Sequence, residues 1–166
     1  MRGKISGSAP PPGGPKTEIV RVTSTEKQIF CCVSSAVFGQ WIHWYGKRSH
    51  ECTLEAGNCN GCQRGWPRKW KGYMHAMTGA PPRTVFVEIT PACFELVAML
   101  APQEKSLRGV YLYLSKTKGG AKGRYLVEVL ERRADESQLP EERDPRPILK
   151  FLWACKNQSG MNGVET

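Results

Sequence analysis

Apolar and polar residues alternate along several short stretches of the chain, and this period of two predicts β-strands. The segment 18–33 is predicted to form one long bent strand or a tight pair of strands, because EIVRV alternates and QIFCCV is a short apolar run. The segment 70–77 alternates in the same way. Three further stretches are rich in strand-favouring residues, namely 84–89, 109–115 and 124–130.

The period changes to that of a helix over residues 90–101. Thr90 is a suitable N-cap residue, and Pro91 occupies the first helical position, where its missing N–H costs nothing. Phe94 and Val97 begin a set of apolar residues at helical spacing. The sequence therefore predicts one helix between two groups of strands.

The order of these elements is a long strand, an insertion, two strands, a helix and two strands. This order predicts a mainly β (small α+β) fold over residues 17–131, specifically a five-stranded OB-like barrel with its helix between the third and fourth strands. The insertion at 41–70 then joins the first two strands, and the glycine-rich segment 116–123 joins the last two. Another small β-rich or α+β fold is the alternative.

The segments outside this domain have their own character. Residues 1–16 are rich in Pro, Gly and Ser and are predicted to form a disordered tail, and 157–166 a second, shorter tail. The charged, proline-containing segment 132–147 is predicted to be a linker or long loop. The apolar segment 148–156 is expected to dock on the domain, as either helix or strand.

Composition and charge indicate which partners and which cellular compartment to expect. The formal net charge of +9 favours a polyanion or an anionic membrane as partner. The sequence has no apolar run of the roughly 18 residues that a spanning helix needs, and its first residues lack a signal-peptide pattern. The odd count of seven cysteines fits poorly with a framework built only of disulfides. We therefore expect a cytoplasmic protein without a membrane partner.

Three cysteines and two histidines fall within a short stretch of the insertion. Cys59 and Cys62 form a Cys-x2-Cys pair, and six residues separate Cys52 from the pair. With His43 or His50 as the fourth ligand, the set is the Cys3His shell of a structural zinc site. We favour His43, because the longer loop closes more freely, and keep His50 as the alternative. A closed shell of four protein ligands would order the loop without performing chemistry.

The competing interpretations of this cluster are free thiols and a surface disulfide such as Cys52–Cys62. His75 is expected on the surface of a strand. The remaining cysteines are expected to be core or incidental thiols: Cys31, Cys32, Cys93 and Cys155.

Aromatic and basic residues are interleaved around the same cluster. Residues 41–75 contain six Lys or Arg against Glu51 and Glu55. Stacking rings next to cations are typical of proteins that bind single-stranded nucleic acid. Trp66 and Trp70 are the favoured stacking pair. The full set of predicted nucleic-acid-binding residues is Arg64, Trp66, Arg68, Lys69, Trp70, Lys71, Tyr73, Lys116, Lys118 and Lys122.

Through His43, Cys52, Cys59 and Cys62 the chain resembles the helix-destabilising single-stranded-DNA-binding proteins of T-even phages, which combine a His, Cys, Cys-x2-Cys zinc subdomain with an OB-fold. The resemblance covers these four residues and implies Zn²⁺ as cofactor and single-stranded DNA as partner. The chain otherwise looks like small bacterial zinc proteins with a similar pattern.

No constellation of nucleophile, base and orienting carboxylate is visible, and the acidic residues concentrate in one charged segment. The sequence therefore predicts a non-enzymatic, zinc-stabilised protein that binds single-stranded DNA or RNA. The alternative is a zinc-stabilised protein-interaction module that does not bind nucleic acid.

Overall fold

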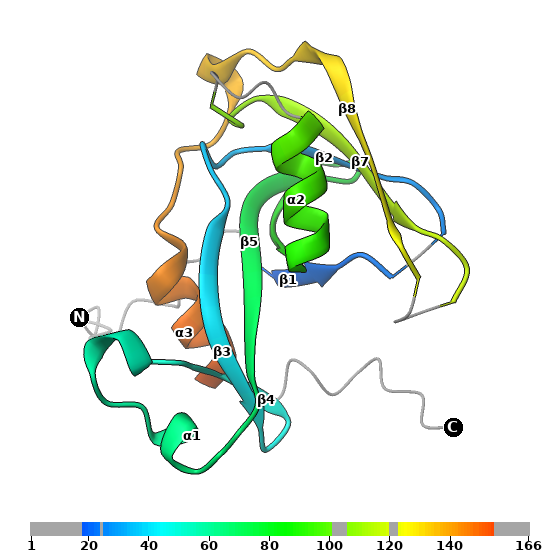
Figure 1. Cartoon of the computed structure of the whole chain (residues 1–166). Helices are drawn as coiled ribbons and strands as arrows, with labels where there is room; N and C mark the ends of the chain where they lie inside the picture. The colour runs from blue at the N-terminus through cyan, green and yellow to red at the C-terminus, as the bar shows by residue number, and fades with distance from the viewer. Residues whose placement is uncertain (1–17, 24, 101–105, 120–122, 155–166) are drawn as a thin grey trace, which may run out of the picture.

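The computed structural model describes residues 18–23, 25–100, 106–119 and 123–154 (Figure 1). The two predicted tails, Cys155 and Lys122 lie outside the described residues. Within them the protein is mainly β, as predicted. The strands are β1 (Glu18–Arg21), β2 (Gln28–Cys32), β3 (Phe38–Tyr45), β4 (Arg48–Glu51), β5 (Arg68–Thr78), β6 (Arg83–Ile89), β7 (Val110–Lys116) and β8 (Tyr125–Arg133).

The helices are few. The α-helices are α1 (Asn60–Gln63), α2 (Pro91–Leu100) and α3 (Pro145–Ala154), and 3₁₀ turns lie at Leu54–Ala56 and Glu136–Gln138. The helix predicted at 90–101 is confirmed as α2, and Thr90 caps it by accepting a hydrogen bond from the Cys93 amide at 3.4 Å. The docking element is the helix α3. No helix in the described residues has the length and apolar character needed to cross a membrane.

The eight strands form one mixed sheet. Six of them follow the order β1-β6-β5-β2-β7-β8, and β3 and β4 lie off this path. Strand β1 runs parallel to β6, and the other pairs are antiparallel. Strand β3 pairs with the first half of β5 and with β4, which places β2 and β3 along the same edge of β5. Between them, the Val33 and Ser34 amides both donate to the carbonyl of His75, at 2.8 and 3.1 Å.

The predicted five-stranded OB-like barrel is not confirmed. In the described residues no ladder joins β1 to β8, so the sheet stays open. The segment 18–33 forms two strands that do not pair with each other, because β1 lies beside β6 while β2 lies between β5 and β7. The sequence predicts a loop for the insertion at 41–70, but it contains most of β3 and all of β4, which extend the same sheet.

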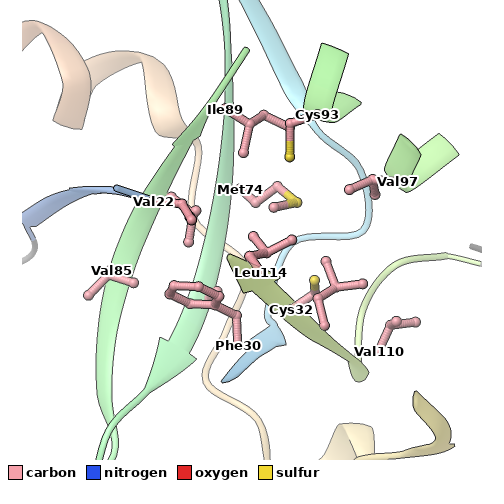
Figure 2. Close-up of a cluster of buried hydrophobic side chains, with 13 residues drawn as sticks. Val22, Phe30, Cys32, Met74, Val85, Ile89, Cys93, Val97, Val110 and Leu114 are labelled. Atoms are coloured by element: carbon pink, nitrogen blue, oxygen red, sulfur yellow. The ribbon is translucent and has the colours of Figure 1, made fainter. Parts of the chain in front are cut away.

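One face of the sheet carries the larger core. Strand β5 contributes Met74 and Ala76 to it, and α2 contributes Cys93 and Val97, all at most 1% exposed. Figure 2 shows the Cys93 and Val97 side chains pointing toward Met74. Because residues two apart in a strand share a face, the alternation of 70–77 places these residues on one side. Helix α2 is therefore held against the sheet by apolar contacts.

The opposite face of the sheet carries a smaller core beneath α3. It consists of Tyr73, Phe86 and Leu149, each at most 1% exposed. His75 belongs to this face and is only 2% exposed, with its ring stacked on Phe86 at a centroid distance of 5.0 Å. Its predicted surface position is therefore wrong, because α3 and the segment before it cover a face that alternation alone leaves open to solvent.

The different burial of two apolar residues of α3 predicts different losses of stability when each is truncated. Leu149 is fully buried, whereas Phe151 is 53% exposed. Leu149→Ala should lower the free energy of unfolding by about 2–5 kcal/mol, since it leaves a cavity. Phe151→Ala should change it by about 0.5 kcal/mol or less. Urea denaturation measures both, and equal effects would contradict the docking of α3 through Leu149.

Candidate metal centre

The hairpin β3–β4 positions His43. The two strands are joined by Gly46 and Lys47, whose φ angles of 61° and 62° are those of a two-residue type I′ turn. His43 lies opposite His50 on β4 and opposite Arg68 on β5, so strands on both sides fix its backbone. The His43 side chain is fully buried.

The segment after β4 folds back toward this hairpin. Cys52 follows β4 directly, and its amide donates to the Trp41 carbonyl at 2.9 Å. Gly57, with a φ of 86°, caps the 3₁₀ turn at Leu54–Ala56, and Thr53 hydrogen-bonds to the carbonyl of Asn58. Cys59 then stands at the N-cap of the short helix α1. These local bonds close the segment without a hydrophobic core of its own.

Four side chains meet where this segment reaches β3. Ligand atoms of His43, Cys52, Cys59 and Cys62 all lie within 4.8 Å of one another. The Nε2 atom of His43 is 3.3 Å from the Cys59 sulfur and 3.5 Å from the Cys62 sulfur, and the sulfurs of Cys52 and Cys62 are 3.7 Å apart. These are the four residues that the spacing predicted, and they lie close enough together to hold a metal ion.

The second nitrogen of His43 fixes the orientation of its ring. Nδ1 is 3.1 Å from the carbonyl oxygens of both Trp66 and Pro67, which can only accept a hydrogen bond. The proton therefore sits on Nδ1, and the lone pair of Nε2 faces the sulfurs. Backbone carbonyls orient metal-binding histidines in this way.

The alternative ligand His50 makes a different contact. Its Nε2 lies 3.0 Å from the carbonyl oxygen of Tyr45, within its own hairpin. His50 is not among the residues whose ligand atoms cluster. The geometry therefore favours His43 as the fourth ligand.

The three thiols cannot ionise equally well by themselves. The backbone amide of Cys62 lowers the pKa of the Cys59 thiol to about 5, although burial opposes ionisation. Burial and the neighbouring sulfurs of Cys52 and Cys59 raise the pKa of Cys62 to about 11. Three thiolates at this spacing repel one another, and a bound cation removes that repulsion. The donor set therefore suits a thiophilic divalent cation.

The structure bears differently on the two competing interpretations of the cysteines, a Cys52–Cys62 disulfide and free thiols. The Cys52–Cys62 separation of 3.7 Å is well beyond the S–S bond length of about 2.05 Å. Each of the six cysteines in the described residues is free. Cys31, Cys32 and Cys93 are buried, as expected of core thiols.

Gly61 allows α1 to approach the ring of His43. A Cβ atom at this position would lie 2.5 Å from Cδ2 of His43, closer than real contacts allow. Glycine is therefore needed here for space. This contact joins residues that are 18 positions apart, so the sequence alone gives no signal for it.

The structure uses the two favoured tryptophans for packing. Trp66 stacks on Tyr45 at a centroid distance of 4.2 Å and an interplanar angle of 11°. Trp70 packs against Phe94 of α2, at 5.4 Å, and also covers Gly39. Both rings therefore have part of their surface occupied by protein contacts, and their role as the stacking pair stays a prediction.

The other predicted nucleic-acid-binding residues near the cluster differ in their burial and in their contacts. Tyr73 is buried, and Lys71 lies 3.3 Å from the carboxylate of Glu88. The guanidinium of Arg64 lies 5.5 Å from the Trp66 ring. Arg68 lies 4.2 Å from the ring centroid of Trp41. Lys69 is exposed.

The remaining predicted lysines lie elsewhere. Lys116 and Lys118 are at the turn between β7 and β8, which Figure 1 shows on the opposite side of the molecule from α1. The structure therefore does not bring them to the metal-centre hairpin, because the barrel that would have joined the two loops is absent.

Sequence reasoning missed the exposed rings of the hairpin. Trp41, Trp44 and Tyr45 are 39%, 48% and 53% exposed. The stretch FGQWIHWY is rich in the aromatic residues that favour strands, but most of it lies in the insertion at 41–70, for which the sequence analysis predicted a loop.

Comparisons of the chain with protein-family models, with curated proteins and with solved structures find no match. The function of the protein has to be inferred from the geometry of the site itself.

The two histidines of the hairpin give a first test of the site. His43→Ala should lose the bound ion and His50→Ala should keep it, because only His43 directs a ring nitrogen at the sulfurs. Elemental analysis of purified protein measures the metal per chain. Metal retained by His43→Ala and lost by His50→Ala would identify His50 as the ligand.

Gly61 gives a second test that leaves every ligand in place. Gly61→Ala should weaken metal binding by about tenfold or more, since the added methyl displaces the His43 ring. Competition with a chromogenic chelator measures the affinity. The neighbouring Asn60→Ala is the matched control and should bind as the wild type does. An unchanged affinity of Gly61→Ala would contradict the close approach of α1 to His43.

Proposed function

We propose that the ion is Zn²⁺ and that it has a structural role. Three sulfurs and one imidazole nitrogen form the Cys3His set that zinc binds in tetrahedral structural sites. Four protein ligands leave no coordination position for a substrate. Zinc then orders the segment 52–67 against β3. The free cysteines of the described residues fit a reducing compartment, and we propose the cytoplasm.

We further propose that the protein is a non-enzymatic binder of single-stranded nucleic acid, with the zinc-held hairpin as its contact region. The supporting observation is the exposure of three aromatic rings on this hairpin, Trp41, Trp44 and Tyr45. Apolar side chains that are exposed together on one small element mark binding sites more often than single exposed ones do. We call these rings, together with Lys47, Arg48, Arg68 and Lys69, the aromatic–basic surface.

Cations and rings are close enough on this surface to act together. Lys47, Arg48 and Lys69 are exposed beside the rings, and the Arg68 guanidinium covers one face of Trp41. Unpaired bases stack on aromatic side chains, while Lys and Arg contact the phosphates. A duplex keeps its base faces stacked inside, so it would use the cations alone. The combination therefore favours single strands.

The exposed rings of the hairpin lie on both faces of β3. Trp41 and Tyr45 lie on one face of β3, and Trp44 lies on the other, because side chains alternate along a strand. In the described residues β4 pairs only with β3, so the hairpin ends in an open edge. A flexible single strand can follow this edge and contact both faces.

Oligonucleotide binding tests the proposal directly. Oligo(dT) or a matched RNA should quench tryptophan fluorescence, and a duplex of equal length should quench it less. Contacts with about five phosphates would give a slope of log K against log salt near −3.5. A folded, metal-loaded protein that shows no quenching at low salt would instead support the protein-interaction module, which would use the same exposed rings.

Variants then locate the contact. Trp41→Ala and Trp44→Ala should each cost about 1–3 kcal/mol of binding free energy, since each removes a stacking platform. Leu126→Ala removes a side chain that is 50% exposed on β8 and should have no effect. Bound metal is measured in each variant, so that loss of the site is not mistaken for loss of contact. An equal effect of all three would place the contact elsewhere.

A further inference from the structure

A second site lies away from the metal centre, between α2 and the strands β7 and β8. A cavity of about 660 Å³ opens there. Its walls include Ala92, Leu96 and Met99 from α2, and Lys116, Arg124 and Tyr125 from the two strands. Cavities of this volume are typical of small-molecule sites.

Lys116 is the unusual residue of this cavity. It is only 8% exposed, and its ammonium lies 4.6 Å from the centroid of the Tyr125 ring. No carboxylate lies within ion-pair distance of it in the part of the chain that the structure describes. A cationic group that lines a cavity and has no carboxylate partner attracts a negatively charged ligand, and the cation–π contact with Tyr125 leaves its charge uncompensated. The site therefore favours an anion.

Other groups around Lys116 add to the positive potential. Arg124 is exposed at the rim of the cavity and makes no ion pair within the described residues. Helix α2 begins at Pro91, directly after the lining residue Thr90, and its first turn carries no acidic residue. The N-terminus of a helix carries partial positive charge. Glu95 also lines the cavity, and its carboxylate is the one negative group among the lining residues.

The wall formed by α2 has a different chemistry. Ala92, Leu96 and Met99 supply aliphatic surface, and Met99 is 66% exposed. The helix sequence PACFELVAML contains only one charged residue, so its outer side is apolar as well as the side that faces the core. A helix that packs on one side only normally has a polar outer face. The apolar outer face indicates contact with an apolar partner.

We propose that this cavity binds a small amphipathic anion, a carboxylate or phosphate carried on an aliphatic chain. Lys116 and Arg124 bind the anionic group, and the chain lies along Ala92, Leu96 and Met99. The site shares no residue with the aromatic–basic surface, so the proposal does not depend on nucleic-acid binding.

Octanoate and octyl phosphate are the two probes, and they separate carboxylate from phosphate recognition. The protein is labelled with ¹³C-methyl methionine, and calorimetry measures the affinity. Saturable binding with a shift of the Met99 methyl signal is expected. Affinity should rise by up to about fourfold for each methylene added between hexanoate and decanoate, all used below their micelle concentrations. Inorganic phosphate and octyltrimethylammonium, which lack the chain and the negative charge respectively, should bind at least tenfold more weakly.

Lys116→Met removes the charge and keeps the length of the side chain. It should weaken binding of the better probe at least tenfold, whereas Lys118→Met, on the same turn but exposed, should bind as the wild type does. A thermal melt verifies that each variant is folded, and Arg124→Met replaces Lys116→Met if the latter is not. Equal binding of octanoate and octyltrimethylammonium, or wild-type affinity of the folded charge variant, would overturn the proposal.

Discussion

The antiparallel pairing of β3 with the first half of β5 is the constraint on which the metal centre depends. It runs from Phe38 opposite Tyr73 to His43 opposite Arg68. Because Arg68 begins β5, the same pairing places the carbonyls of Trp66 and Pro67 beside the ring of His43. This ladder therefore fixes the end of the cysteine segment that leads into β5 and the ring orientation of His43, whereas the β3–β4 ladder fixes the end that begins at Cys52.

Strand β5 also connects this hairpin to the rest of the protein. Its first half pairs with β3, and its second half pairs with β2 and contributes to the cores on both faces of the sheet. The metal-centre hairpin is thus an extension of the main sheet. This explains how a segment with few buried apolar residues is held in place: the ladder supplies its position, and the four-ligand cluster closes its loop.

Glu88 and Lys116 are both mostly buried, but different groups surround their charges. Glu88 is 4% exposed and is compensated by Arg21 at 2.9 Å, by the Tyr73 hydroxyl at 3.1 Å and by Lys71 at 3.3 Å. Lys116 is 8% exposed, and its ammonium lies 4.6 Å from the Tyr125 ring centroid with no carboxylate at ion-pair distance in the described part of the chain. Glu88 lies in the sheet between residues that can reach it, whereas Lys116 lies at the rim of a cavity. The charge of Glu88 is therefore compensated within the fold, whereas the charge of Lys116 is available to a ligand.

The sequence by itself determined most of the local structure and the ligand set. Alternation identified the strand at 70–77, and strand-favouring residues identified those at 84–89, 109–115 and 124–130, because both signals depend only on neighbouring residues. The Cys-x2-Cys pair with Cys52 and a histidine identified the residues that lie close enough together to hold a metal ion, since a turn of two residues brings two thiols to one side. Both signals are carried by short stretches of chain.

Only the tertiary structure decided the sheet order, the choice of His43 over His50, and which rings are exposed. Trp66 and Trp70 have basic neighbours in the sequence, yet Tyr45 and Phe94 pack against them from other elements. The open eight-stranded sheet likewise depends on β1 pairing with β6, more than 60 residues away. Pairing and burial are set by contacts between distant segments, and the period of a single segment holds no information about which partner will cover it.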